Sequence, residues 1–186
     1  MTQKLQITEI YLSVQGESSF AGRPCVFVRT TGCPLRCRWC DTVYSFEGGQ
    51  AYSEADLMKE IASYGVSLVE LTGGEPLAQK GCYDLANKLI GEGFEVLIET
   101  SGAEDLTGLD EKITVIMDIK CPGSNMEHKK RWQNLLLIKP HHEVKFVISS
   151  DDDFHWAVQK IKEHGLEQKA KVLLSPAFGL YEASRL

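Results

Sequence analysis

Short apolar runs rich in Val and Ile alternate with longer amphipathic segments along the chain, and this alternation restricts the fold more than any other feature. Most runs are too short for helices and are continuously apolar, which predicts parallel strands buried on both faces. A partly alternating segment at residues 7–15 predicts one added strand before the repeating pattern. The predicted core strands are residues 26–29, 68–72, 95–100, 113–119, 144–148 and 172–174.

Helical patterns lie between several of these runs. Ser53 is typical of an N-cap, and Leu57 and Ile61 follow it at helical spacing. Two further apolar stripes cover residues 83–90 and 154–161, and a shorter helix is expected within 125–137. Strands that alternate with helices predict an α/β fold. With about six parallel core strands, too few for a closed eight-stranded barrel, we expect an open partial (β/α) barrel, formed by residues 1–186 as one domain.

Composition and charge indicate what kind of molecule the protein binds. Hydrophobic residues make up 43% and charged residues 25% of the chain, as in ordinary globular proteins. The net charge is -6 and the basic residues are scattered, which argues against a nucleic-acid groove and favours a small-molecule substrate. No window of about twenty apolar residues suggests a membrane span, and the N-terminus is unlike a secretory signal, so we expect a cytoplasmic protein.

Three of the six cysteines, Cys33, Cys37 and Cys40, lie within eight residues directly after the first predicted core strand. This spacing favours metal ligands in a reducing compartment over disulfides. A closed zinc site needs four ligands, and the nearest fourth, Cys25, begins a strand that leads away. A cluster of four irons can instead take three thiolates and leave one iron open. The other cysteines are expected to be small buried residues.

Polar or glycine-rich segments follow most of the predicted strands. Ligands of parallel sheets gather where the strands end at their carboxyl edge, so these segments indicate where a site would form. They are residues 30–32, 72–76, 100–102, 118–120 and 175–176.

The C-x3-C-x2-C spacing, with Trp39 before the last cysteine, resembles the radical S-adenosylmethionine (SAM) superfamily. The run Leu71-Thr72-Gly73-Gly74-Glu75-Pro76 resembles its second signature. The resemblance implies a 4Fe–4S cluster on Cys33, Cys37 and Cys40 that reductively cleaves SAM to a 5′-deoxyadenosyl radical. It implies cofactor contacts at Trp39, Asp41, Gly73, Gly74, Glu75, Ser101, Asp118, Lys120, Ser175 and Pro176. Loop packing is an alternative role for Trp39, and a surface salt bridge is one for Lys120.

Segments on both sides of the cysteines resemble the 7-carboxy-7-deazaguanine synthase family. They include Val14-Gln15-Gly16-Glu17, Cys40-Asp41-Thr42 and Asp118-Ile119-Lys120-Cys121-Pro122-Gly123-Ser124. That family contracts the ring of 6-carboxy-5,6,7,8-tetrahydropterin with loss of ammonia, regenerates SAM, requires Mg2+, and supplies queuosine and other deazapurine pathways. By the same analogy we expect a homodimer and an electron donor such as flavodoxin or ferredoxin.

The substrate chemistry suggests roles for particular residues. Gln15, with Val14 and Gly16, offers donors and acceptors for the amide-and-amine edge of a pterin, and Glu17 could accept from its amines. Arg29 could hold a carboxylate, Thr72 could reach the substrate, and Thr42 offers an oxygen to Mg2+. The structural alternatives are an edge-strand face for Gln15 and Glu17, an ion pair for Arg29 and a turn cap for Thr42.

Two other functions remain open at this stage. A glycyl-radical activating enzyme would share the cluster loop but would not need Gln15 and Arg29. A non-catalytic iron–sulfur or zinc module would not need the Gly73-Gly74-Glu75 turn. The family resemblance also implies a helix and a strand-like segment beyond residues 175–179 that help enclose the substrate, a part of the pocket that this sequence, ending at Leu186, leaves without a counterpart.

Overall fold

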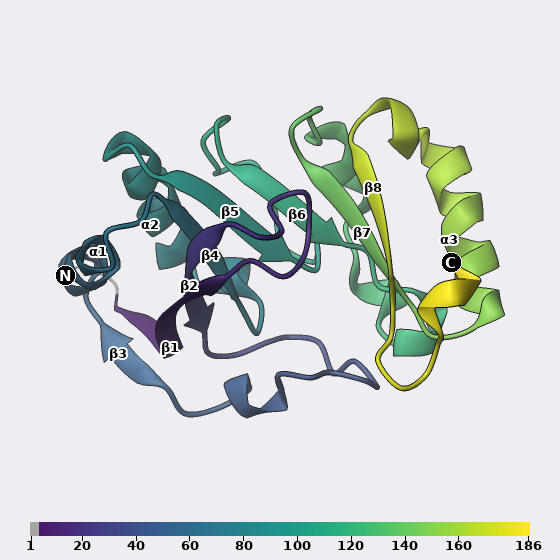
Figure 1. Cartoon of the computed structure of the whole chain (residues 1–186), viewed down its shortest axis with the longest axis horizontal. Coiled ribbons are helices and arrows are strands. Elements are labelled where there is room, and N and C mark those ends of the chain that lie inside the picture. The colour runs from purple at the N-terminus through teal and green to yellow at the C-terminus, as the bar shows by residue number, and fades with distance from the viewer. Residues whose placement is uncertain (1–3) are drawn as a thin grey trace. The chain divides into compact units, whose positions relative to one another are not determined.

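The structure, a computed structural model, describes residues 4–186, so residues 1–3 of the predicted domain lie outside it (Figure 1). The chain divides into two compact units. The first comprises Met1–Pro34, Thr42–Thr100 and Thr107–Thr114, and the second comprises Leu35–Asp41, Ser101–Leu106 and Val115–Leu186. The cysteine loop therefore contributes residues to both units.

The first unit is built on five strands in the order β3-β1-β2-β4-β5. The parallel core consists of β2 (Pro24–Thr30), β4 (Leu68–Gly73) and β5 (Glu95–Thr100). The added strand β1 (Leu5–Val14) pairs antiparallel with β2, as the segment 7–15 predicted. The short strand β3 (Gln50–Tyr52), which pairs with the start of β1, was not predicted because its three residues carry no apolar pattern.

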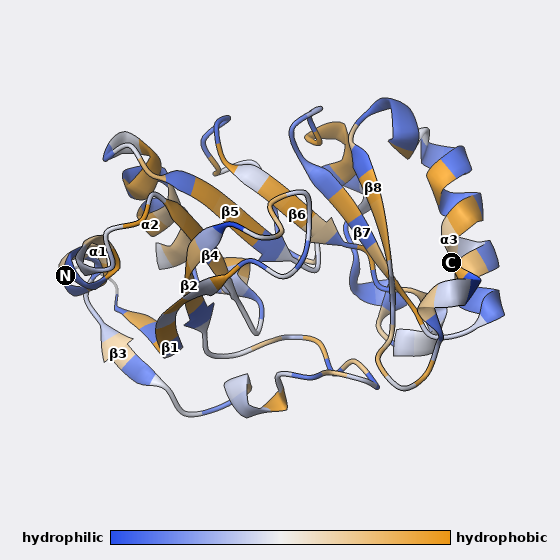
Figure 2. Cartoon of the chain, viewed as in Figure 1, coloured by the Kyte–Doolittle hydropathy of each residue, from blue (hydrophilic) through white to orange (hydrophobic). Residues whose placement is uncertain are grey.

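Two helices accompany these strands, α1 (Glu54–Ser63) and α2 (Gly81–Gly91). The predicted N-cap of α1 is confirmed, because the Ser53 Oγ accepts a hydrogen bond from the Asp56 backbone N–H at 3.1 Å. Leu57 and Ile61 on the buried face of α1 are 0% exposed. Figure 2 shows the same division into apolar and polar residues, with orange strands and mixed helices. Burial of these apolar faces holds the helices on the sheet.

The second unit contains the parallel strands β6 (Thr114–Asp118), β7 (Glu143–Ile148) and β8 (Lys171–Pro176), with β6 beginning at the boundary between the units. Helix α3 (Asp151–His164) joins β7 to β8. Its N-cap is Ser150, and Gly165 ends it in the left-handed region with φ 61°. Six described strands thus run parallel to a neighbour, three in each unit, and neither unit closes on itself, as expected for an open α/β fold.

The prediction of a short α-helix within residues 125–137 is wrong. The segment forms two separate 3-10 turns, Glu127–Lys129 and Trp132–Leu136. Lys130 between them is extended, with φ −74° and ψ 149°. Its ammonium lies 4.9 Å from the ring centroid of Trp132 and 4.5 Å from that of Trp156 on α3. These cation–π contacts stabilise the extended segment between the two turns.

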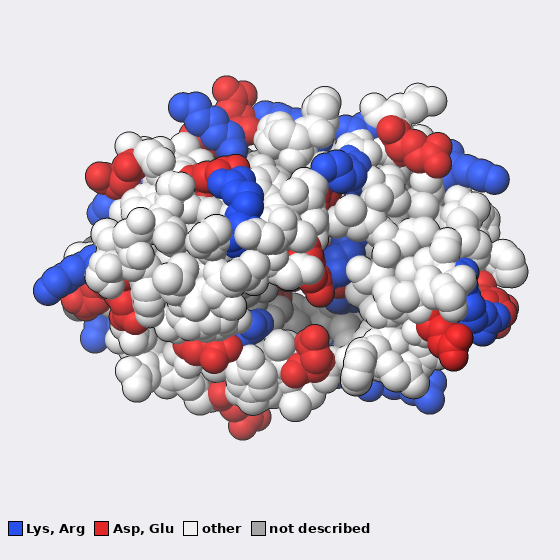
Figure 3. All heavy atoms as spheres, viewed as in Figure 1, with Lys and Arg blue, Asp and Glu red and all other residues white. Residues whose placement is uncertain are grey.

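The surface agrees with the charge pattern of the sequence. On the face shown in Figure 3, basic and acidic side chains are intermixed and form no stripe of one sign. None of the helices within residues 4–186 is long and apolar enough to cross a membrane.

Candidate active site

In the first unit, β2 and β4 end side by side, with Thr30 opposite Gly73. The backbones that follow them are tied together. The Gly74 N–H donates to the Thr30 carbonyl at 3.1 Å, and the Glu75 N–H donates to the Gly32 carbonyl at 2.9 Å. The glycine turn therefore supports the segment that leads directly into Cys33.

Glycine is required in this turn by the close approach of the two backbones. A Cβ atom on Gly74 would lie 2.0 Å from the Gly32 carbonyl oxygen. Gly73 has a φ of 124°, and a Cβ there would lie 2.4 Å from the Thr30 nitrogen. Contact with a ligand is thus not needed to explain the glycines, although it remains compatible with them.

Replacing Gly74 with Ala should therefore push the turn away from Gly32 and displace Cys33. We expect a loss of about 1–3 kcal/mol in the free energy of unfolding, and Tm falls by roughly 2–4 °C per kcal/mol in a chain of this size. Iron content after anaerobic reconstitution should fall as well. Gly91→Ala is the matched control, because a Cβ there meets nothing within 4 Å and the residue ends α2. An unchanged Tm and iron content for Gly74→Ala would contradict the packing argument.

Glu75 holds the same turn from inside the protein. Its carboxylate is 0% exposed and accepts hydrogen bonds from the Leu77 N–H at 3.2 Å and from the Thr100 hydroxyl at 2.7 Å. The Glu75 side chain, predicted as a cofactor contact, is thus engaged with its own turn and with the end of β5.

The six cysteines are all free thiols, and they differ in exposure. Cys25, Cys82 and Cys121 are buried, as expected, whereas Cys33, Cys37 and Cys40 are partly exposed. Burial raises the pKa of the Cys25 thiol to about 12, which suits an inert core residue better than a fourth ligand.

The cysteine loop fits the donor set of a cubane cluster. No three His, Cys, Asp or Glu side chains of residues 4–186 are grouped like the ligands of a single metal ion. A cubane binds each thiolate through a different iron and does not require the three sulfurs to meet at one point. In the second unit the Cys40 N–H donates to the Cys37 carbonyl at 3.2 Å, which holds that part of the loop in a tight turn.

Loop residues of the second unit rest on the turn after β6. The Arg38 N–H donates to the Ser124 carbonyl at 3.2 Å. Asp153 at the start of α3 is 1% exposed and fixes that turn by accepting from the Gly123 N–H at 2.8 Å and the Ser149 hydroxyl at 2.5 Å. Sequence analysis missed Asp153, whose only visible signal was its position three residues after the N-cap Ser150.

The Asp118–Lys120 pair also belongs to the second unit. The Lys120 ammonium donates to Asp118 Oδ2 at 2.6 Å. This salt bridge is largely buried, with side chains 23% and 9% exposed, so it is not the surface salt bridge considered as an alternative. The second carboxylate oxygen, Oδ1, is buried and has no hydrogen-bond partner in the described chain. Burial raises the pKa of the Cys37 thiol, and Lys120 opposes this shift while Asp118 adds to it. An unpartnered buried acceptor close to a cluster cysteine is consistent with a polar ligand bound there.

The remaining predicted cofactor contacts of this unit differ in how exposed they are. Trp39 is half-buried, Asp41 is exposed, and Ser175 and Pro176 are half-buried where β8 ends. The Ser101 hydroxyl accepts from the Ala103 N–H at 3.4 Å, so it closes a turn after β5.

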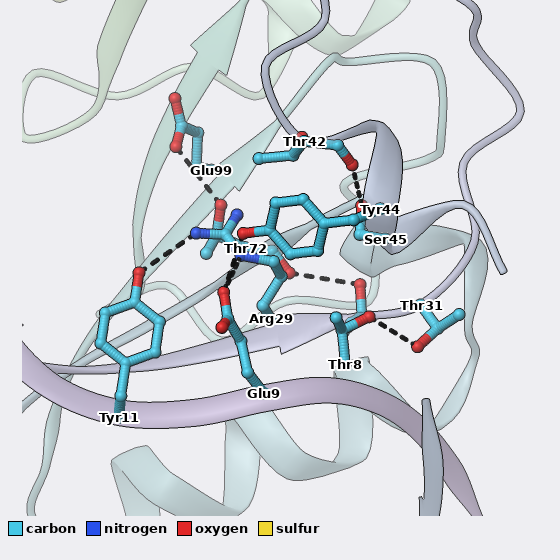
Figure 4. Close-up of polar contacts among 11 residues, drawn as sticks. Thr8, Glu9, Tyr11, Arg29, Thr31, Thr42, Tyr44, Ser45, Thr72 and Glu99 are labelled. Atoms are coloured by element: carbon cyan, nitrogen blue, oxygen red, sulfur yellow. Dashed lines mark hydrogen bonds and ion pairs between the residues drawn. The ribbon is translucent and has the colours of Figure 1, made fainter. Parts of the chain in front are cut away.

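Arg29 and Thr72 lie on adjacent strands of the first unit, in register with each other. The Arg29 side chain is 13% exposed, and its Nε donates to Glu9 Oε1 at 2.7 Å (Figure 4). Burial lowers the pKa of the guanidinium, but Glu9 and Tyr11 outweigh this effect, so the pKa is raised and the group stays charged. The Thr72 hydroxyl donates to Glu99 at 3.3 Å. The ion pair considered for Arg29 therefore exists, and Glu9 is its partner. Sequence analysis missed Glu9 and Tyr11, which contact Arg29, and Glu99, which accepts from Thr72.

Gln15 lies beyond the end of β1, near the amino end of β2. It is 4% exposed, donates to the Glu70 carboxylate and accepts from the Glu17 N–H at 2.9 Å. Its neighbours Val14, Gly16 and Glu17 are exposed. Between Gln15 and Arg29, the rings of Tyr11 and Phe27 stack with centroids 5.2 Å apart. Gln15 and Arg29 are thus separated along the length of β2.

Thr42 precedes the 3-10 turn Val43–Ser45. Its side chain makes no capping bond to this turn, although its carbonyl accepts from the Ser45 N–H at 2.9 Å and hydroxyl at 2.8 Å. The turn-cap role considered for the Thr42 hydroxyl is therefore absent.

Comparisons with known proteins agree with this arrangement. The profile of the Radical SAM superfamily matches residues 27–126. A 7-carboxy-7-deazaguanine synthase from Koribacter versatilis is 46% identical over 177 residues, which cover 94% of this chain and 78% of the relative. One from Chlorobaculum tepidum is 41% identical over 96% of this chain and 82% of the relative.

A solved structure supports the same conclusion. The crystal structure of QueE from Escherichia coli matches with a TM-score of 0.76 and 27% identity, covering 93% of this chain and 84% of that chain. This match confirms the predicted α/β class with an open partial barrel. The chain therefore belongs to the radical SAM superfamily and, within it, to the 7-carboxy-7-deazaguanine synthase family.

Proposed function

We propose that this radical SAM lyase converts 6-carboxy-5,6,7,8-tetrahydropterin into 7-carboxy-7-deazaguanine, with loss of ammonia, for queuosine and other deazapurine pathways. The observation that carries the proposal is a half-buried, charged arginine on β2 four residues before the first cluster cysteine. A carboxylate-bearing substrate needs such a group close to the reacting carbon. A relative named 7-carboxy-7-deazaguanine synthase, 46% identical to this chain, supports the proposed reaction.

The chain holds its cofactors through two groups of residues. Cys33, Cys37 and Cys40 ligate the 4Fe–4S cluster, which supplies, together with bound SAM, the radical that removes hydrogen from the substrate. The buried Asp118 Oδ1 accepts a hydrogen bond from SAM, and the backbone at Gly73 and Gly74 lines its methionyl group. Further cofactor contacts come from Trp39, Asp41, Glu75, Ser101, Lys120, Ser175 and Pro176.

The first unit binds the substrate along β1 and β2. Arg29 holds the carboxylate at one end, and Gln15, with the backbone of Val14 and Gly16, pairs with the amide-and-amine edge at the other. Glu17 and Thr72 complete the set of substrate contacts, and Thr42 provides an oxygen ligand for Mg2+.

The protein works in the cytoplasm as a homodimer, and both compact units of residues 1–186 serve one reaction as a single functional domain. Its electron donor is a small protein such as flavodoxin or ferredoxin. An external donor follows from the chemistry, because the cluster must be reduced before it can cleave SAM, and the cysteine thiolates do not supply that electron. When SAM is regenerated, the electron returns to the cluster, so one reduction can serve many turnovers.

The test is anaerobic incubation of reconstituted protein with SAM, a reductant, Mg2+ and the carboxypterin, followed by mass spectrometry. We expect a deazapurine with a carboxylate in molar excess over the SAM supplied, because SAM is regenerated. The matched control is tetrahydropterin without the carboxylate, which should give no deazapurine. Cleavage of SAM without any deazapurine would refute the proposal and favour a glycyl-radical activating enzyme.

A further inference from the structure

Glu9, Tyr11, Arg29 and Tyr44 form a polar cluster on the first unit, named here the Glu9 cluster (Figure 4). Glu9 Oε1 accepts from Arg29 Nε at 2.7 Å and from the Tyr44 hydroxyl at 2.9 Å. The Tyr11 hydroxyl accepts from Arg29 Nη2 at 3.1 Å. The guanidinium carbon lies 5.9 Å from the ring centroid of Tyr44. Arg29 is thus held on several sides by side chains from β1 and from the segment after Thr42.

These contacts leave one edge of the guanidinium available. A guanidinium has five N–H groups in a planar fork. Glu9 takes the Nε–H and Tyr11 takes one at Nη2, and Arg29 donates to no other side chain or backbone group of residues 4–186. The Nη1 and Nη2 pair still offers the parallel donors that bind a carboxylate bidentately. Glu9 therefore occupies the side of Arg29 that a substrate carboxylate does not need.

The Glu9–Arg29 pair contributes little to stability. The Glu9 side chain is 39% exposed, and Tyr44 is 54% exposed. An ion pair with one partner this exposed is screened by solvent, and such pairs are commonly worth 1 kcal/mol or less. Loss of Glu9 should leave the fold intact, so its main effect must be on the orientation and charge of Arg29.

The same carboxylate also reaches the segment after the cluster loop. Tyr44 lies two residues after Thr42, within the turn Val43–Ser45. Through Tyr44 and Arg29, Glu9 Oε1 connects this turn to β2 by two hydrogen bonds. A change at Glu9 therefore affects both the arginine and the turn that follows Thr42.

We propose that Glu9 is a positioning residue that fixes the guanidinium of Arg29 through Nε, aims its Nη edge at the substrate carboxylate, and cancels its charge in the absence of substrate. The inference rests on the proposed role of Arg29 in substrate binding. It assigns two separable functions to Glu9: a hydrogen-bond acceptor that sets direction, and a negative charge that limits attraction for anions.

Substitutions at Glu9 separate these functions. Glu9→Gln retains an acceptor for Nε but removes the charge, so kcat should stay within a few-fold of the parent while the KM for the carboxypterin falls severalfold. Glu9→Ala removes both, and kcat should fall on the order of tenfold to a hundredfold, since a misplacement of about 1 Å can cost that much. Tyr44→Phe removes one bond to Glu9 and should give a smaller loss of the same kind.

The experiment measures kcat, KM and the ratio of deazapurine to 5′-deoxyadenosine for these variants, with Tm as the check on folding. Calorimetry on the reconstituted protein adds the Kd of the carboxypterin and of tetrahydropterin without the carboxylate. Glu9→Gln should tighten only the first of these ligands. Glu54→Ala, which removes another ion-paired carboxylate of the first unit, is the matched control and should change none of these values.

Failure of the inference differs from failure of the proposed function. If Arg29→Ala turns over the carboxypterin like the parent, Arg29 has no role in substrate binding and the proposed substrate site is wrong. If Arg29→Ala is impaired while Glu9→Ala and Glu9→Gln keep the parent's kcat, KM and product ratio, Glu9 is not a positioning residue and this inference alone is wrong.

Discussion

Replacing Cys37 with Ala is expected to leave a folded protein that assembles no 4Fe–4S cluster and forms no product. A cubane held by three thiolates cannot lose one of them, because its fourth iron must stay open for SAM and no other protein ligand replaces the missing thiolate. Iron and sulfide should fall from about four per chain in the reconstituted parent to well below one. The loss should be equally complete for Cys33→Ala and Cys40→Ala, and analysis of iron and sulfide with an electron paramagnetic resonance spectrum measures it.

Cys82→Ala is the matched control for this prediction. Cys82 is 0% exposed within α2, and burial raises the pKa of its thiol to about 12. A thiol in that position behaves as a small core residue, so alanine should cost little stability and no iron. Stoichiometric zinc in place of iron in the parent, or an intact cluster in Cys37→Ala, would overturn the ligand assignment.

The main elements of the fold could be predicted because each has a local cause. Continuous apolar runs became β2, β4, β5, β6 and β7, which are mostly buried, since strands buried on both faces need apolar side chains. The run 172–174 also became a strand, β8, but its residues are only half-buried, so the expectation that it is buried on both faces was wrong. Ser53 and Gly165 marked helix ends through the backbone groups they satisfy or the conformation they permit. Such signals depend on neighbours along the chain and are therefore visible in the sequence.

The elements that sequence analysis missed depend on contacts between distant residues. The strand β3 is defined by its pairing with the start of β1 and not by its own composition. Lys130 is extended where a helix was expected, and its ammonium contacts the rings of Trp132 and of the distant Trp156. Neither contact can be predicted from the periodicity of apolar residues along the sequence.

The polar groups around Arg29 illustrate the same limit at the site. Arg29 itself was predicted from its place before the cluster loop, but Glu9 and Tyr11 were not. The antiparallel register of β1 against β2 runs without a shift from Val14 opposite Pro24 to Glu9 opposite Arg29, and this pairing decides which β1 side chains face Arg29. Alternation of polar and apolar residues in β1 does not reveal which residue of β2 each side chain will face. A sequence can therefore indicate the principal residue of a site while its supporting contacts emerge only from the fold.

Substitutions at Arg29 should separate substrate turnover from SAM cleavage. Arg29→Ala removes the ion-pair partner of Glu9, but Glu9 is partly solvated and keeps its hydrogen bond from Tyr44, so the fold and the cluster should persist. Loss of a hydrogen-bonded charge for the substrate carboxylate costs about 2–5 kcal/mol, on the order of 100-fold or more in kcat/KM. Uncoupled cleavage of SAM to 5′-deoxyadenosine should continue. Arg29→Lys should restore only part of the rate, because an ammonium lacks the planar fork.

Thr42→Ala should alter the response to Mg2+ instead. The Thr42 hydroxyl makes no capping bond to the turn after it, so its removal should not disturb Val43–Ser45. If this oxygen binds Mg2+, the rate for Thr42→Ala should rise little with added metal, whereas the parent's rate should rise until the site is saturated. Product formation against Mg2+ concentration, for the parent and for both Arg29 variants as metal-responsive controls, measures the difference. A parent that works equally well in chelator, or a Thr42→Ala variant with the parent's Mg2+ response, would exclude Thr42 as the magnesium ligand.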